Sequence, residues 1–166
     1  MKHYSSLCVI AGFLPLAVIT GLFFVDRDFT LFANYISVLG TGQYGVIFNS
    51  SLVLAAVLSA PFLVGMRKGI TSYMFIGSAA TLAGVGLFPA TAAVHWYFAA
   101  AFFLLIFASI LVTGLAVKGP AGKISIVIGL AGFSGLASLN PAVETILVYA
   151  IGGWVMVAGL RYKKTK

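Results

Sequence analysis

Six long apolar segments limit what this chain can fold into more than any other feature of its sequence. They cover residues 5–25, 44–66, 70–88, 95–117, 123–139 and 142–160. Each is near the roughly 20 residues that an α-helix needs to cross the hydrocarbon of a bilayer. Only helices and closed barrels satisfy the backbone there, and these segments lack the alternation of barrel strands, so the pattern predicts membrane-spanning helices.

The composition supports this interpretation. Of the 166 residues, 61% are hydrophobic and only 8% are charged, whereas about a quarter of the residues in a soluble domain are charged. We therefore expect one all-α domain over residues 1–166, a polytopic six-transmembrane-helix bundle in the cell membrane. The first segment is too long for a signal peptide and lacks a clear cleavage site, so we expect it to be retained.

The charged residues predict the orientation. Arg27 is the one basic residue on the side that also carries Asp26, Asp28 and Glu144. The opposite side carries the other nine basic residues, namely Lys2, Arg67, Lys68, Lys118, Lys123, Arg161, Lys163, Lys164 and Lys166. Because short basic loops stay in the cytoplasm, we expect a multi-pass protein with both termini cytoplasmic. The same rule explains the net charge of +7 without a nucleic-acid partner.

The longest connection, residues 26–43, lies on the outer side in this topology. Its residues Phe29, Phe32, Ile36 and Leu39 fall at helical spacing, which predicts a short amphipathic helix in the outer interface. Such a helix is either a lid that only covers the bundle or a flap over an outward-opening cavity that holds a lipid or another amphiphile.

His95 and Glu144 are the candidate catalytic residues. His95 opens the fourth segment beside Trp96 and Tyr97, a position that also suits an interfacial residue. Glu144 lies one turn inside an apolar segment, where a carboxylate is costly unless it is paired or hydrated, so we expect His95 or Arg27 as its partner. Together the two side chains could move a proton in a reaction at a lipid headgroup.

Four further residues are candidate ligand-binding residues: Asp28, Ser37, Asn49 and Asn140. Asn49 lies just below the outer connection and either forms a hydrogen bond between helices or contacts a headgroup. Asn140 precedes Pro141 and also suits the N-cap of the last helix.

We expect neither a metal nor a cofactor. The sequence has no phosphate-binding glycine loop, nucleophile elbow or metal-binding helix motif. Cys8 is the single cysteine and suits a small packing residue. Gly129, Gly132 and Gly135 repeat every three residues, a spacing typical of close helix contacts in membranes.

Several short motifs occur together in a distinctive order. They are Ile36-Ser37-x-Leu39-Gly40 leading to Phe48-Asn49, then Gly84-x-Gly86-x-Phe88-Pro89, then His95, and finally Glu144 at the head of the last helix. In this order they resemble the archaeal and bacterial membrane family called domain of unknown function 998, over about residues 5–160.

The resemblance implies a six-span bundle with a shared polar site on its outer side. The matching residues would be Ser37, Gly40, Asn49, Pro89, His95 and Glu144. This chain has Val38 where family members commonly carry an acid, so that acid has no counterpart here. A looser likeness links the Ile-Ser-x-x-Gly loop to eukaryotic Frag1/DRAM-type six-span proteins, which are associated with lipid handling.

Three functions agree with these features. The leading hypothesis is an outward-facing pocket for a membrane lipid or small amphiphile, and the sequence leaves open whether the protein is an enzyme. The second is a transporter or channel for a small solute or protons, which would need polar residues that continue to the cytoplasmic side. The third is a structural subunit, a homo-oligomer or a partner in a membrane complex, with glycine faces as its interface.

Overall fold

The fold consists entirely of helices in the residues that the computed structural model describes, which are 2–65, 69–138 and 140–164. Side chains are described in these ranges except at residues 2–4, 62–65 and 162–164. The elements are α1 (Lys2–Val25), the 3₁₀ helix η1 (Ile36–Gly40), α2 (Gly45–Gly65), α3 (Ile70–Leu87), α4 (Ala93–Ala116), α5 (Pro120–Leu136) and α6 (Pro141–Lys164). The predicted helix boundaries agree with these to within about one helical turn.

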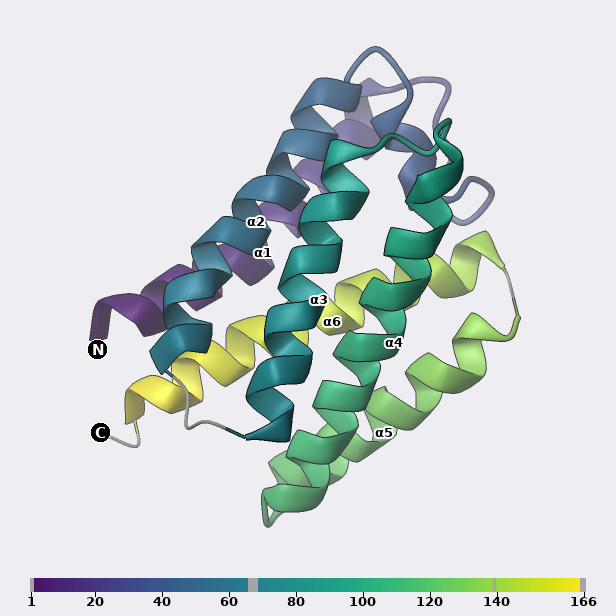
Figure 1. Cartoon of the computed structure of the whole chain (residues 1–166). Helices are drawn as coiled ribbons and strands as arrows, with labels where there is room; N and C mark the ends of the chain where they lie inside the picture. Colours follow the sequence, from purple (N-terminus) through teal and green to yellow (C-terminus); the bar gives the residue numbers. More distant parts are fainter. Residues whose placement is uncertain (1, 66–68, 139, 165–166) are drawn as a thin grey trace.

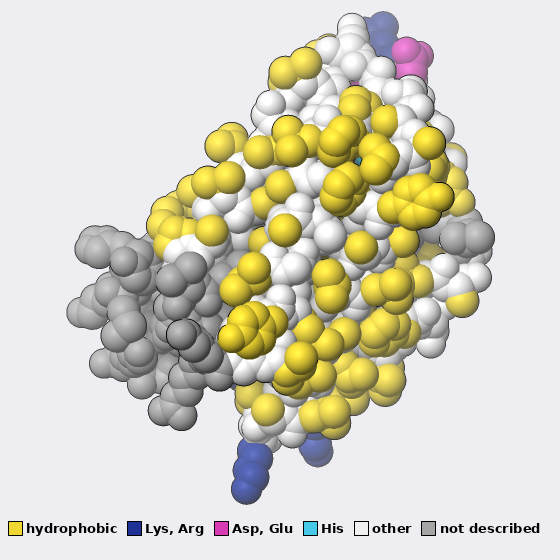
Figure 2. Space-filling model, viewed as in Figure 1, with side chains coloured by type: hydrophobic (Ala, Val, Ile, Leu, Met, Phe, Trp, Pro, Cys, Tyr) yellow, Lys and Arg dark blue, Asp and Glu magenta, His cyan; other side chains and the backbone are white. Residues whose placement is uncertain are grey.

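Among the residues that the structure describes, four helices are long and apolar enough to cross a bilayer, over Ser5–Val25, Ile70–Leu87, Ala93–Ala116 and Pro141–Arg161. The stretches Gly45–Pro61 in α2 and Pro120–Leu136 in α5 are apolar but shorter. Figure 2 shows that the coloured charged side chains on this face lie near its two ends, and that hydrophobic side chains cover much of the surface between them. The chain is therefore a membrane protein.

Consecutive helices pack side by side, each against the next, from α1 to α5, and α6 returns to pack along α1. Figure 1 shows η1 and the α3–α4 connection at one end of the bundle, and the start of α1, the end of α2 and the end of α6 at the other. We call the end that contains η1 the η1 end. Residues more than a hundred positions apart meet at the α1–α6 seam, where the Ser5 hydroxyl donates to the Gly159 carbonyl at 2.8 Å.

Glycines bring α4 and α5 close together. A Cβ added at Gly129 would come within 2.8 Å of the Leu111 side chain, and one added at Gly132 would collide with the Phe107 ring. Both glycines are buried. The glycine face of α5 is therefore used inside this bundle, where it allows the backbones of α4 and α5 to approach.

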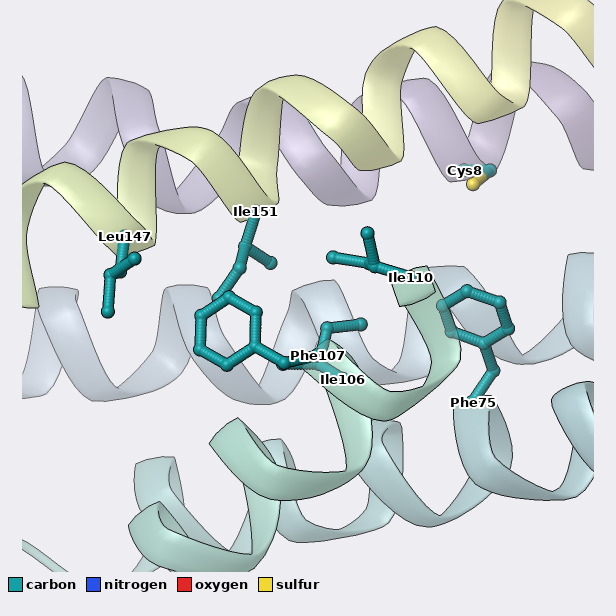
Figure 3. Packing of buried hydrophobic residues seen from close by; sticks show 7 residues of the cluster. All are labelled: Cys8, Phe75, Ile106, Phe107, Ile110, Leu147 and Ile151. Atoms are coloured by element: carbon teal, nitrogen blue, oxygen red, sulfur yellow. The ribbon is translucent and has the colours of Figure 1, made fainter. Parts of the chain in front are cut away.

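The centre of the bundle is apolar. Figure 3 shows Leu147 and Ile151 of α6 pointing toward Ile106 and Phe107 of α4, with Phe75 of α3 nearby. The Phe75 ring also stacks on Trp154, with ring centroids 5.5 Å apart. These contacts join α3, α4 and α6 around the middle of the fold.

The predicted amphipathic helix in the outer connection is wrong in its extent. Phe32 has a φ of 71° and is exposed, so no helix runs from Phe29 to Leu39. The Thr30 and Asn34 backbones form a turn, which the Asn34 side chain closes by accepting from the Thr30 N–H at 2.8 Å. This local hydrogen bond competes with helix formation. Only η1 is helical, and Ile36 and Leu39 are buried in it.

Some predictions concern residues outside the described part of the chain. They are the segment ends at Met66 and Leu139, the basic residues Arg67, Lys68 and Lys166, and the side chains of Lys2, Lys163 and Lys164. Lys118, Lys123 and Arg161 are described, and all three are exposed.

Candidate functional site

The bundle holds an elongated cavity of about 230 Å³. Its walls come from α1, η1, α2, α3, α4 and α6, whereas α5 contributes no residue. On α4 the lining runs from His95 to Thr113, which corresponds to roughly 27 Å at the helical rise of about 1.5 Å per residue. The cavity therefore extends along most of the length of the bundle.

Polar groups that are free to bind a ligand gather at the η1 end of this cavity. Ser37, His95 and Glu144 line it there. Farther along, the hydroxyls of Ser59 and Ser78 donate to carbonyls of their own helices at 2.7 and 2.8 Å. Most of the remaining lining is aliphatic or aromatic. The cavity thus has one polar end and an apolar body, the division expected of a site for an amphiphile.

Thr113 is an exception near the opposite end. Its hydroxyl is buried and has no hydrogen-bond partner among the described residues. Because a buried hydroxyl without a partner is costly, this position suits a water molecule or a polar group in the cavity.

His95 occupies the first turn of α4 and is buried, with 2% of its surface exposed. Its Nδ1 lies 2.7 Å from the carbonyl oxygen of Phe88, the residue that follows α3. A carbonyl oxygen can only accept, so Nδ1 carries the proton and Nε2 is the acceptor in the neutral ring. This hydrogen bond fixes the ring orientation at the wall of the cavity.

Glu144 lies in the first turn of α6 and is partly buried. Its Oε2 accepts a hydrogen bond from the Ile36 N–H at 2.8 Å. The predicted partners, His95 and Arg27, are wrong, because no ion pair joins Glu144 to either side chain in the described chain and Arg27 is exposed. The free N–H at the start of η1 satisfies the carboxylate instead.

Asn49 supports the other end of η1. Its Nδ2 donates to the Gly40 carbonyl at 3.0 Å, and a Cβ added at Gly40 would lie 2.5 Å from its Oδ1. Asn49 does not line the cavity. Glu144 and Asn49 together therefore hold η1 across the end of the bundle, with Ile36 and Ser37 facing the cavity.

The remaining candidate residues lie outside the cavity. Asp28 is exposed and lines a separate surface hollow with Asp26, whose Oδ1 accepts from the Asp28 N–H at 3.2 Å. Asn140 is exposed, and its Oδ1 accepts from the Ala142 N–H at 2.8 Å, as an N-cap does. Pro89 begins the turn before α4, where its carbonyl accepts from the Ala92 N–H at 2.8 Å.

The sequence could not identify the partners of the two candidate catalytic side chains, because both partners are backbone groups, the Phe88 carbonyl and the Ile36 N–H. Every residue supplies a carbonyl and every residue except proline supplies an N–H, so no sequence signal marks these partners. The arrangement places an imidazole and a carboxylate in the wall of one cavity without direct contact between them. A polar group that enters this end of the cavity can therefore meet either side chain.

The comparisons with known proteins agree with the resemblance seen in the motifs. A family model described as "Protein of unknown function (DUF998)" matches residues 9–161. No curated protein and no solved structure matches the chain. The likeness to Frag1/DRAM-type proteins stays a prediction.

Proposed function

We propose that this chain, which belongs to the DUF998 family of proteins of unknown function, binds a single-chain amphiphile inside its helical bundle. The apolar chain would occupy the body of the cavity, and the polar head would lie between Ser37, His95 and Glu144 under η1. The observation that carries the proposal is the division of the cavity, with Ser37, His95 and Glu144 gathered at one end and only the Thr113 hydroxyl unpartnered near the other among the described residues. The cavity, at roughly 27 Å along α4, is nearly as long as the roughly 30 Å hydrocarbon core is thick, so it has the length to hold an extended single chain.

The proposal includes a topology with six spans and both termini in the cytoplasm of a cell. The packing of α2 and α5 beside helices that are long and apolar enough to cross a bilayer supports their crossing the same membrane. The nine basic residues on the side of the termini support the orientation. The polar end of the cavity would then face outward.

Filling the cavity tests the proposal. Ala99 lies one turn after His95 and lines the cavity, whereas its neighbour Ala100 is exposed and does not. Ala99→Leu should block the chain of an amphiphile, and Ala100→Leu is a matched control that adds the same volume outside. Trp154 lines the cavity and reports on its contents, once Trp96→Phe has removed the exposed second tryptophan.

The measurement is quenching of Trp154 fluorescence by a single-chain alcohol that carries bromine at mid-chain, with the protein in nanodiscs of phosphatidylcholine. We expect Ala99→Leu to reduce the apparent affinity by about tenfold or more, since a filled cavity leaves no room for the chain. In Ala100→Leu the probe should quench Trp154 as strongly as it does in the parent protein. Equal quenching in both variants would show that the probe reaches Trp154 from the bilayer and would refute the proposal.

Transport of an amphiphile or small solute is the second candidate function. The extent of the cavity along α4 favours it, because a path must reach most of the way across the membrane, and so does the unpartnered Thr113 hydroxyl near the end opposite His95. Reconstituted vesicles would show flux that falls in Ala99→Leu and not in Ala100→Leu. Binding without flux would support the proposed binding of an amphiphile and contradict transport.

A further inference from the structure

We propose that the amphiphile bound in the cavity carries a primary amine head and not an acidic one. This inference rests on the proposed function, since it specifies which head the same site would take. It follows from the hydrogen-bonding groups that the structure leaves available at the polar end, and from the charges that are missing there.

The first available group is the Nε2 atom of His95. Because the Phe88 carbonyl holds the proton on Nδ1, Nε2 presents a lone pair in the neutral ring. The described part of the chain gives this ring no second hydrogen bond. A ligand in the cavity therefore meets an acceptor at His95, which needs a donor.

The second available group is the Glu144 carboxylate. One of its oxygens accepts from the Ile36 N–H at 2.8 Å, and no other hydrogen bond to this carboxylate is found among the described residues. A carboxylate has room for about four acceptor interactions. Its remaining acceptor sites favour a head that brings several N–H donors, and an ammonium group brings three.

The charge balance of the cavity leads to the same head. No Lys or Arg lines it, so Glu144 is its one charged side chain among the residues described. Arg27, the basic residue of the η1 end, is exposed and outside the cavity wall. An acidic head would lie beside a carboxylate without a compensating cation, which is strongly unfavourable away from water. An ammonium head would supply the missing positive charge.

Ser37 completes the polar end. Its side chain is buried, with 9% of its surface exposed, and it lines the cavity from η1. A hydroxyl both donates and accepts, so it adapts to an amine head and does not itself select against one. The preference for an amine head over an acidic one would come from His95 and Glu144.

Three brominated amphiphiles with one shared chain and different heads test the inference: a primary amine, an alcohol and a carboxylate. Each is titrated into Trp96→Phe protein in phosphatidylcholine nanodiscs, and quenching of Trp154 gives its apparent affinity after correction for its partition into protein-free nanodiscs. Trp154 is ten residues beyond Glu144 on α6, or roughly 15 Å along the helix, at a depth that mid-chain bromine can reach.

We expect the amine to bind at least about tenfold more tightly than the carboxylate, with the alcohol between them. Glu144→Gln keeps an oxygen for the Ile36 N–H and removes the charge. It should therefore lower the apparent affinity for the amine by about tenfold and change the apparent affinity for the alcohol by less than about threefold. The inference is wrong if the carboxylate binds as tightly as the amine, or if Glu144→Gln lowers the affinities for the amine and the alcohol equally. Either result would still agree with binding of an amphiphile in the cavity. If none of the three probes binds differently in Ala99→Leu, the proposed function itself fails.

Discussion

The carboxylate of Glu144 accepts a hydrogen bond from the backbone N–H of Ile36 at 2.8 Å, across 108 positions of the chain. The bond joins the first turn of α6 to the first residue of η1. At the other end of η1 the Asn49 amide donates to the Gly40 carbonyl. One short 3₁₀ helix is thus attached at both ends to long helices, and its residues Ile36 and Ser37 line the cavity together with His95.

Glu144→Ala should loosen the start of η1. A hydrogen bond to a charged group contributes about 1.5–3 kcal/mol, so the amide of Ile36 should exchange its hydrogen roughly ten to a hundred times faster. Hydrogen–deuterium exchange with mass spectrometry on the peptide that contains Ile36 measures this. Asp28→Ala, an exposed acid on the same end, is the control and should leave that amide unchanged. Equal exchange of Ile36 in Glu144→Ala and the parent protein would contradict a role for this bond.

Asn49→Ala should destabilise the bundle by about 1 kcal/mol, because the Gly40 carbonyl loses a neutral hydrogen bond. Thermal unfolding in one detergent measures the change. Ser50→Ala is a matched control, since Ser50 is the next residue of α2 and is exposed. Asn49→Asp tests the direction of the bond, because a carboxylate cannot donate to a carbonyl, and it should be at least as unstable as Asn49→Ala. A stable Asn49→Asp would contradict the assignment of Nδ2 as the donor.

Much of the fold follows from the sequence, because a bilayer leaves few choices. An apolar segment of about 20 residues must satisfy its own backbone and therefore becomes a helix. The start of α5 at Pro120, ahead of the predicted residue 123, reflects the good fit of proline in a first turn. The connection before η1 could not be predicted, since the side chain of Asn34 and the left-handed backbone of Phe32 decide it locally.

Part of the candidate site also follows from the sequence. Ser37, His95 and Glu144 were expected together on the outer side, and the structure brings all three to one cavity. Asn49 illustrates the limit, since its amide was expected either to join helices or to bind a ligand, and the structure shows a hydrogen bond to the carbonyl of Gly40. Whether a polar residue in an apolar segment meets a cavity or a carbonyl depends on the rotation of its helix, which composition does not determine.

Gly132→Ala should destabilise the bundle, because the added methyl group would collide with the Phe107 ring in the buried contact between α4 and α5. Overpacking of this kind typically costs about 1–3 kcal/mol. Gly153→Ala is a matched control in α6, where a Cβ meets nothing within 4 Å, and it should be neutral or stabilise its helix by up to about 1 kcal/mol. Thermal unfolding of both variants in one detergent gives the comparison. Equal stability would mean that α5 can move away from α4 without cost.

Two substitutions of His95 should separate its structural role from its role toward a ligand. His95→Asn keeps an N–H donor near the position of Nδ1 and removes the acceptor at Nε2. We expect it to keep the bond to the Phe88 carbonyl, to change stability by less than about 0.5 kcal/mol, and to lower the affinity for the brominated amine by about tenfold.

His95→Gln extends its amide toward the position of Nε2 and gives up the bond to Phe88. It should lose about 1 kcal/mol of stability and keep more of the affinity for the amine, because its side-chain oxygen replaces the acceptor. Thermal unfolding and quenching of Trp154 on the same preparations supply both readings. If affinity falls in step with stability in the two variants, His95 only supports the fold, and the acceptor in the cavity must come from Glu144 alone.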